Sequence, residues 1–418
     1  MPIWRPFTPH HDETPPPLRI VRAQGAYLYI DDGRSLWDGT CAWWVTVHGH
    51  AHPYIAEAIA RQAATLDHVL FGDLIHPPAE ILAEKLSQKT GLPYVFFSDN
   101  GSTATEVAIK IAIQYFFNQG RPRKTLLALE GAYHGDTFGA MAASARDLFT
   151  RPFEPFLFEV KFLPFPSPEN EARFQAALAE IENDPDIIGF IGEPILQGVA
   201  GMRSYTPAAW DVIARAVRKA GGLVIADEVF TGFGRTGSFL ATDQCQEKPD
   251  LLCLSKGVTG GFLPLGLTLA AAHVFEAFRG KDPLRTFYHG HSYTGNPIAC
   301  AAAVANLELW ERPETTQKLH ELVQAQATLA DKLRQLLPPH TVRHTGLVLA
   351  IDLPGTPGYI AEHRHYLKAY AISRGVYLRP LGSVAYILPT LASRPEELAY
   401  AAEVVLSYVQ ERGTVAAL

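Results

Sequence analysis

The sequence predicts an α/β fold with a mainly parallel central sheet. From about residue 94, short apolar runs alternate with segments of helical periodicity, which is the pattern of strands joined by covering helices. Strands are expected over YVFFS, TLLALE, IIGFIGEP, GLVIADE, LLCLS and LGLTLAA, and a helix is expected over TATEVAIKIAIQYF. A chain of 418 residues is long enough for one large domain and a smaller companion.

The two ends of the chain have a different pattern. Residues 1–50 are rich in proline and aromatic side chains, and AYLYIDDGRSLWDG predicts a hairpin that turns at Asp32-Gly33. After about residue 310, the charged helix ETTQKLHELVQAQATLADKLRQLL precedes a mixed strand and helix tail. We expect residues 1–50 and 311–418 to form one small α+β domain beside a large domain of residues 51–310.

The composition disfavours several classes of protein. The 36 basic and 43 acidic residues leave a net charge of −7, and no Lys/Arg-rich run suggests a nucleic-acid partner. No apolar stretch approaches the roughly 18 residues of a membrane span, and the N-terminus lacks the pattern of an export signal. The four cysteines have no CxxC spacing, so we expect neither a zinc site nor disulfides, and a cytoplasmic protein.

Polar residues at the ends of the expected strands are candidates for a site, because ligands gather at the carboxyl ends of parallel strands. Lys256 follows LLCLS, and a partly desolvated lysine amine can form a Schiff base with an aldehyde. Asp227 ends GLVIAD, where a buried carboxylate can pair with a protonated pyridine nitrogen. By position alone, Lys256 is also explained as a surface lysine in a loop, and Asp227 as a turn or capping residue.

The segment DNGSTATE lies between the first expected strand and its helix. Asn100, Gly101 and Ser102 can present backbone N–H groups and a hydroxyl to a phosphate. The alternative is an ordinary helix start, with Thr103 and Glu106 as a capping box.

The motif EGAYHGDTFGA places Tyr133 in a glycine-flanked loop, where its ring can stack on a cofactor ring or simply join the core. Together, the four strand ends supply an aldehyde anchor, a partner for a ring nitrogen, a phosphate cradle and a ring platform. Pyridoxal phosphate needs all four.

Several motifs resemble those of the class III aminotransferases of fold type I over nearly the whole chain. They are EGAYHGDTFGA, IGEPILQG, ADEVFTGFGRTG, SKGVTGG and HGHSYTGNP. The resemblance implies pyridoxal 5'-phosphate as cofactor, with Lys256 as the Schiff-base lysine and Asp227 as the partner of the pyridine nitrogen. It also implies that Gly101 and Ser102 bind the phosphate and that Tyr133 contacts the ring and the substrate.

The same resemblance implies a homodimer with active sites at the subunit interface. Gly290, His291 and Ser292 of HGHSYTG would then reach the substrate and phosphate of the neighbouring subunit.

Within the class, IWRPFT, DGTCAWWVTVHGHAHP and GVYLRPLGSVAYILP are similar to the members that act in biotin biosynthesis. These convert 7-keto-8-aminopelargonic acid into 7,8-diaminopelargonic acid by a ping-pong transamination. The similarity implies that Trp43 and Trp44 wall the aliphatic chain and that Arg379 binds the carboxylate. Tyr386 and Arg235 are expected as further pocket and donor contacts. Without the resemblance, a buried aromatic pair and a surface arginine explain the same residues.

Two positions bear on the amino donor. Members that use S-adenosylmethionine often have tyrosine where Phe7 stands, and proline-threonine where this chain has His291-Ser292. The Trp43-Trp44 pair favours S-adenosylmethionine, and lysine is the alternative donor. Another ω-amino acid transaminase, an aminomutase or a non-catalytic binding module are the remaining alternatives.

The alternating histidines of HGHAH offer a competing site. In an extended segment, His48, His50 and His52 would face one side and could bind a metal. No acidic or thiol ligand accompanies them, so we expect a turn with structural histidines and no metal.

Overall fold

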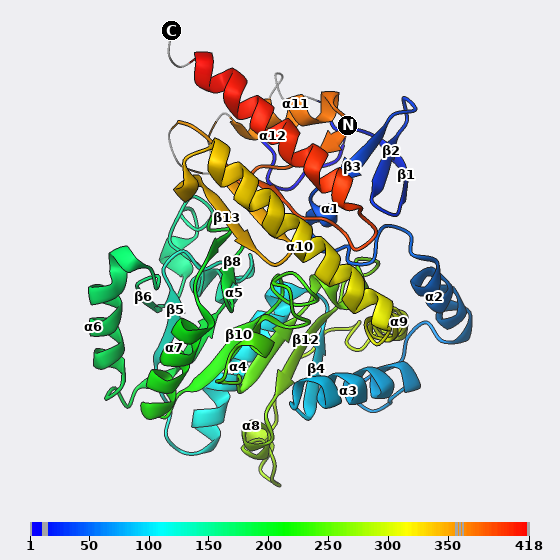
Figure 1. Cartoon of the computed structure of the whole chain (residues 1–418). Coiled ribbons are helices and arrows are strands. Elements are labelled where there is room, and N and C mark those ends of the chain that lie inside the picture. The colour runs from blue at the N-terminus through cyan, green and yellow to red at the C-terminus, as the bar shows by residue number, and fades with distance from the viewer. Residues whose placement is uncertain (1, 11–15, 356–357, 359–360, 362, 416–418) are drawn as a thin grey trace.

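A seven-stranded sheet forms the centre of the molecule, which is described by a computed structural model of residues 2–10, 16–355, 358, 361 and 363–415. The strands lie in the order β4-β12-β11-β10-β7-β5-β6, and only β12 runs antiparallel to its neighbours (Figure 1). Their bounds are β4 (Tyr94–Ser98), β5 (Thr125–Leu129), β6 (Lys161–Leu163), β7 (Ile187–Gly192), β10 (Leu223–Asp227), β11 (Leu251–Leu254) and β12 (Gly266–Ala270). The mainly parallel sheet expected from the apolar runs is therefore confirmed.

Both faces of this sheet are buried, as the near-continuous apolar runs require. Leu251 and Cys253 pack into one core, whereas Leu252 and Leu254 of the same strand pack into the other. The first core includes α4 and α8, and the second includes α3, α6, α7 and α9. The helices are α2 (Pro53–Thr65), α3 (Pro77–Thr90), α4 (Gly101–Asn118), α5 (Phe138–Ala142), α6 (Glu171–Ile181), α7 (Pro207–Lys219), α8 (Ala272–Glu276) and α9 (Pro297–Trp310). Short 3-10 helices are η1 (Glu154–Phe156), η2 (Pro168–Asn170), η3 (Ala241–Gln244), η4 (Lys256–Thr259), η5 (Pro283–Arg285) and η6 (Pro339–Thr341).

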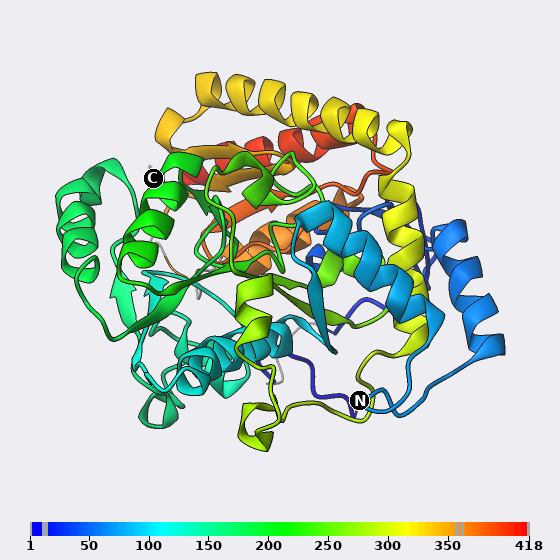
Figure 2. The ribbon, with the colours of Figure 1, turned by 90° about the horizontal axis from the view of Figure 1, so that it is seen from below.

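The two ends of the chain pack together, as expected. The predicted hairpin forms between β2 and β3 and turns at Asp32-Gly33, and β15 from the far end of the chain pairs with β3. The helices α10 and α12 lie side by side over the sheet β13-β14-β16 (Figures 1 and 2). The elements are β1 (Ile20–Gln24), β2 (Tyr27–Ile30), β3 (Ser35–Asp38), β13 (Val342–Thr345), β14 (Val348–Asp352), β15 (Val376–Tyr377), β16 (Val384–Ile387), α10 (Pro313–Leu336), α11 (His363–Ser373) and α12 (Pro395–Val415). A small two-stranded sheet pairs β8 (Leu196–Gln197) with β9 (Arg203–Ser204). The domain limits at residues 50 and 310 stay a prediction.

Within the described part of the chain, every helix is too short or too polar to cross a bilayer.

The short element α1 (Cys41–Trp44), which follows β3, is a left-handed turn. Its four residues have φ angles of 49°, 49°, 69° and 73°, all in the left-handed region, although none is glycine. A side chain in this region costs about 1–2 kcal/mol per residue, because Cβ crowds the following carbonyl oxygen. Contacts with the surrounding structure must therefore hold the turn in place.

The left-handed backbone makes the stability of one variant informative. Ala42 is exposed, so Ala42→Gly removes a methyl group that packs against little and relieves the strain at that residue. Relief of about 1–2 kcal/mol outweighs the roughly 0.4–1 kcal/mol that glycine adds to the entropy of the unfolded chain. We expect Ala42→Gly to raise the free energy of unfolding in urea by up to about 1 kcal/mol.

The matched control is Ala64→Gly, an exposed alanine in the right-handed helix α2. It should lower the free energy of unfolding by about 0.5–1 kcal/mol. If the free energy of unfolding fell equally in Ala42→Gly and Ala64→Gly, the backbone of Ala42 would not be strained.

Candidate active site

One cavity of about 780 Å³ collects the carboxyl ends of the parallel strands. Asp227 ends β10, Lys256 follows β11, and the loops after β4 and β5 enter from either side. The predicted residues that line it are Phe7, Trp43, Trp44, Gly101, Ser102, Tyr133, Asp227, Lys256 and Arg379. The structure thus brings together residues that the sequence separates by more than 370 positions.

Lys256 has the environment of a reactive amine. Its side chain keeps only part of its surface open, toward the cavity, and Nζ lies 4.7 Å from the centre of the Trp44 ring. Burial lowers the pKa of the amine to about 8, even though Asp227 and Glu193 favour its charged form. An appreciable fraction of the amine is therefore uncharged and nucleophilic near neutral pH.

A buried asparagine holds the segment that carries Lys256 in place. The amide of the buried Asn306 donates to the carbonyl oxygens of Gly257 (3.1 Å) and Val258 (3.0 Å) in η4. The Oδ1 atom of Asn306 lies 2.9 Å from Nε2 of His48. This chain of contacts orients the first turn after β11.

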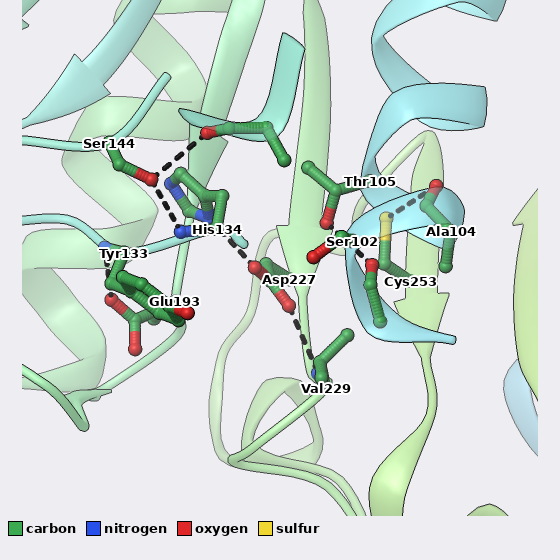
Figure 3. A network of polar contacts seen from close by, with 12 residues as sticks. Ser102, Ala104, Thr105, Tyr133, His134, Ser144, Glu193, Asp227, Val229 and Cys253 are labelled. Carbon is green, nitrogen blue, oxygen red and sulfur yellow. Dashed lines mark hydrogen bonds and ion pairs between the residues drawn. The ribbon is translucent and has the colours of Figure 1, made fainter. Parts of the chain in front are cut away.

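Asp227 is buried and held by two hydrogen bonds. Its Oδ2 lies 2.7 Å from Nδ1 of His134, and its Oδ1 accepts from the backbone N–H of Val229 at 3.0 Å (Figure 3). The backbone N–H of His134 in turn donates to Oγ of Ser144 at 2.9 Å. An oriented carboxylate next to a histidine can hold a proton on a ring nitrogen placed in the cavity. The sequence interpretation missed His134, although it directly follows Tyr133 in the same motif.

The helix α4 begins with a cradle at its N-terminus. Oδ1 of Asn100 accepts from the N–H of Thr103 (3.0 Å), and the N–H of Asn100 donates to the hydroxyl of Thr103 (3.1 Å). The capping box proposed for Thr103 and Glu106 is therefore wrong, because the helix begins at Gly101 and Thr103 is already its third residue. Glu106 instead accepts from the N–H of Gly139 at 2.6 Å.

Two glycines let this cradle close. A Cβ on Gly101 would lie 2.6 Å from Cγ1 of Val229, and one on Gly135, where φ is +132°, would lie 2.1 Å from Oγ of Ser102. The Ser102 hydroxyl oxygen accepts from the N–H of Asp136 at 3.0 Å. Free N–H groups at a helix start, with a hydroxyl beside them, form a site that suits a phosphate.

Glu193 is a second carboxyl group that the sequence interpretation missed. It directly follows β7, and its two oxygens accept from the N–H groups of Tyr133 (3.2 Å) and Gly198 (2.9 Å). Burial raises the pKa of Glu193 to about 7, against the influence of His134. A polar residue that ends the apolar run IIGFIG is the signal that could have identified it.

An apolar wall with one unused donor forms the other side of the cavity. Trp43 is 38% exposed, and Phe7 meets its ring edge to face at 5.5 Å. Cζ of Arg379 lies 4.5 Å from the centre of the Trp43 ring. Nη2 of Arg379 is buried and makes no hydrogen bond within the described residues. An unsatisfied guanidinium nitrogen beside two aromatic rings suits the carboxylate end of an aliphatic substrate.

Some predicted substrate contacts do not line this cavity. Tyr386 lies behind Trp44 and accepts a hydrogen bond from its indole nitrogen at 3.0 Å. Arg235 is only 1% exposed and donates to backbone oxygens, including that of Trp44. Their direct contacts with a substrate stay predictions.

The loop before α9 carries the residues that we expect to act across a dimer. Gly290, His291 and Ser292 do not line the cavity of their own chain, and Gly290 and Ser292 are exposed. Their predicted role in a neighbouring subunit stays a prediction.

The histidines of HGHAH have separate partners. His48 contacts Asn306, and Nε2 of His50 lies 2.9 Å from Oδ2 of Asp38. Among the residues with described positions, no group of three or more His, Cys, Asp or Glu side chains could hold a metal.

These features fit pyridoxal phosphate. A desolvated lysine amine, a buried carboxylate paired with histidine and a phosphate cradle lie around one cavity. Each comes from a different strand end, as the sequence predicted.

Comparisons with known proteins agree with this geometry. Residues 8–408 match the family model described as Aminotransferase class-III. The adenosylmethionine-8-amino-7-oxononanoate aminotransferase of Synechococcus elongatus is 48% identical over 95% of both chains. The enzyme of the same name from Aquifex aeolicus is 35% identical over 98% of this chain and 95% of its own.

Solved structures show the same fold. The crystal structure of the adenosylmethionine-8-amino-7-oxononanoate aminotransferase from Methanocaldococcus jannaschii superposes with a TM-score of 0.91 and 33% identity, covering 98% of this chain and 97% of that one. An amine transaminase from an uncultivated Pseudomonas species, in its PLP-bound form, gives a TM-score of 0.90 at 28% identity and covers 98% and 99% of the chains. The chain therefore belongs to the class III aminotransferases and is a pyridoxal phosphate-dependent aminotransferase of fold type I.

Proposed function

We propose that the protein transfers an amino group from S-adenosylmethionine to 7-keto-8-aminopelargonic acid, forming 7,8-diaminopelargonic acid in biotin biosynthesis. The observation that carries the proposal is the wall of Trp43 beside Arg379, whose Nη2 is buried without a hydrogen bond within the described residues. An indole covers an aliphatic chain, and a guanidinium binds the carboxylate at its end. The names of the relatives from Synechococcus elongatus and Aquifex aeolicus support the same substrates.

When bound, pyridoxal phosphate supplies an aldehyde that accepts amino groups and a pyridine ring that withdraws electrons. The Lys256 amine would hold this aldehyde and, once free, would move a proton from the substrate carbon that bears the amino group to the cofactor. Asp227, oriented by His134, keeps a proton on the ring nitrogen. Gly101 and Ser102 bind the phosphate at the start of α4.

The second half-reaction uses the same groups in reverse. Arg379 binds the carboxylate of the keto acid, and Trp43 and Trp44 exclude water from its aliphatic chain. Tyr133 lines the same cavity, with its ring 6.5 Å from that of Phe149, and would contact the cofactor ring.

The surface around the loop of Gly290–Ser292 supports a homodimer. The side chain of Phe71 packs under Gly295, so the segment before α3 and this loop form one surface. Large apolar side chains there are exposed, including Leu70 (68%), Ile75 (66%) and Tyr293 (68%). A patch of this kind on a globular protein is typical of a subunit interface. In the dimer, His291 and Ser292 reach the cofactor phosphate of the neighbouring subunit.

The four cysteines support a reducing compartment. Cys41, Cys245, Cys253 and Cys300 are free and buried, which is the usual state of cysteine in the cytoplasm. We therefore place the enzyme there.

One observation favours lysine as the alternative donor. Phe7 packs edge to face on Trp43 and offers no hydroxyl group to a donor. The Trp43-Trp44 pair favours S-adenosylmethionine, because the exposed face of Trp43, beside the buried Trp44, can stack on an adenine ring.

The test is product formation by the purified enzyme, loaded with pyridoxal phosphate, from 7-keto-8-aminopelargonic acid and either donor. Diaminopelargonic acid, detected by mass spectrometry, should form with S-adenosylmethionine at a kcat/KM at least about tenfold above that with lysine, a difference of about 1.4 kcal/mol. Lys256→Ala is the negative control and should be inactive with both. Product formation with lysine but not with S-adenosylmethionine would identify lysine as the amino donor. The absence of product with both donors would refute the proposal.

The role of Arg379 can be separated from catalysis. Arg379→Ala should raise the KM for the keto acid by about 10- to 100-fold with a much smaller change in kcat, because a charge-assisted hydrogen bond contributes about 1.5–3 kcal/mol. Arg374→Ala is the matched control, since that exposed arginine stacks on Tyr370 outside the cavity. An unchanged KM in Arg379→Ala would remove the carboxylate clamp from the proposal.

The lowered pKa of Lys256 predicts how fast the apoenzyme takes up its cofactor at different pH. Only the uncharged amine attacks an aldehyde, so with a pKa of about 8 the rate should rise about fivefold from pH 7 to 8 and at most about twofold from pH 8 to 9. A lysine with an ordinary pKa near 10.4 would show about a tenfold rise in both intervals.

Absorbance of the bound cofactor measures this rate. The reaction of pyridoxal phosphate with N-acetyl-lysine methyl ester, followed in parallel, corrects for ionisation of the cofactor itself. A continued tenfold rise up to pH 9 would show that the amine is not desolvated.

A further inference from the structure

The left-handed turn Cys41–Trp44 carries the aromatic wall of the cavity. Trp43 and Trp44 line the site directly, together with Ala42 before them and Val45 after them. Because none of the four turn residues is glycine, their backbone conformation is maintained by its surroundings. The groups that maintain it therefore decide where the two indoles stand.

Asp38 holds the start of the turn. Its carboxylate is fully buried at the end of β3, and Oδ2 accepts from the N–H of Ala42 at 2.7 Å and lies 2.9 Å from Nε2 of His50. Oδ1 accepts from the N–H (2.9 Å) and the hydroxyl (2.7 Å) of Thr40. A single carboxylate thus satisfies two backbone N–H groups of the bend and is itself oriented by a histidine.

Arg235 holds the end of the turn from the other side. It is 1% exposed, and Nη2 donates to the carbonyl oxygens of Trp44 (3.0 Å) and Thr46 (2.9 Å). Nη1 lies 3.4 Å from Sγ of Cys41. The carboxylate of Asp38 thus binds backbone N–H groups at the start of the turn, and the guanidinium of Arg235 binds backbone carbonyl groups at its end.

The held turn connects the reactive amine with the proposed carboxylate site. Trp44 lies beside Nζ of Lys256 at 4.7 Å, and its indole nitrogen is fixed by Tyr386. Trp43 lies beside Arg379 at 4.5 Å. In addition, Asp38 pairs with Tyr377 in β15, two residues before Arg379.

We infer that Asp38 and Arg235 are positioning residues for the substrate: they clamp Cys41–Trp44 in the left-handed turn, so that Trp43 and Trp44 form the wall along which the aliphatic chain lies. The identity of that chain as the keto acid rests on the proposed function. In this arrangement Arg235 affects substrate binding only through the position of the two tryptophans, because its guanidinium group is already hydrogen-bonded to carbonyl oxygens of the turn. The clamp is a determinant of substrate binding that contacts neither substrate nor cofactor.

The first experiment uses the holoenzyme of Asp38→Asn, which keeps the size of the side chain but loses one acceptor. The KM for 7-keto-8-aminopelargonic acid should rise by about tenfold or more, with kcat within about threefold of wild type, because only binding along the wall is disturbed. Arg235→Lys should act in the same direction, since a lysine lacks the fork that reaches two carbonyl groups. Asp32→Asn is the matched control, as Asp32 binds the exposed Arg34 in the β2–β3 turn.

A rescue variant distinguishes a clamp from general damage. Glycine adopts the left-handed region without strain, so Asp38→Asn combined with Ala42→Gly should return the KM to within about threefold of wild type. Asp38→Asn combined with Ala64→Gly should show no recovery. Recovery in both double variants, or a KM in Asp38→Asn equal to wild type, would overturn the clamp.

A readout without turnover separates this inference from the proposed substrate. Acrylamide quenching of tryptophan fluorescence in the holoenzyme reports how far solvent reaches Trp43 and Trp44. Trp4→Phe serves as the background, because Trp4 is 90% exposed and would dominate the signal, whereas Trp37, Trp44, Trp210 and Trp310 are buried. In that background, Asp38→Asn should increase the quenched fraction, Ala42→Gly should restore it, and Asp32→Asn should leave it unchanged.

The outcomes are then distinct. If the wild type fails to convert the keto acid while quenching follows the expected pattern, the proposed function fails and the clamp stands. If quenching in both Asp38→Asn and Arg235→Lys equals that of the background, the clamp fails whatever the substrate is.

Discussion

Desolvation of one lysine amine is the constraint on which the rest of the site depends. An amine surrounded by water stays protonated near neutral pH and cannot attack an aldehyde, so Lys256 must lie against apolar groups such as Trp44. Its backbone must then be fixed without help from solvent, and the amide of Asn306 does this by bonding η4 from behind. These hydrogen bonds hold the segment of Lys256 in the position from which its amine faces the cavity.

The carboxyl groups around the cavity keep this balance. Asp227 and Glu193 both favour the charged form of Lys256, and full ionisation of every nearby acid would raise its pKa. Burial raises the pKa of Glu193 to about 7, so this group carries only part of its charge near neutral pH. The two oxygens of Asp227 are bound by His134 and by the backbone N–H of Val229. One acid is thus oriented by its hydrogen bonds, while the other limits the negative charge of the site.

The sequence predicted the features that depend on local pattern. Apolar runs of four to six residues became six of the seven strands of the central sheet, whereas the three-residue strand β6 was not predicted. Lys256 and Asp227 could be selected because each is a polar residue at the end of such a run. Successive side chains of a strand point to opposite faces of the sheet, which explains why the neighbours Asp227 and Glu228 point in different directions. Asp227 faces the cavity, whereas Glu228 is buried and accepts from the N–H groups of Ala241 and Thr242.

Features that depend on distant partners could not be predicted. The capping box was assigned three residues too late, because Asn100 and Thr103 both belong to the same short polar run and only the backbone decides which of them precedes the helix. Arg235 was expected at the donor from the family resemblance alone, since a single arginine in a glycine-rich loop carries no sign of the direction of its side chain. The left-handed turn has no sequence signal at all, since its residues are those that usually avoid positive φ. Glycine at positions 43 and 44 would relieve the strain and also delete both indoles. The strain is therefore retained where the side chains are needed, and two buried charges compensate for it: Asp38 just before the turn and Arg235 from a distant segment.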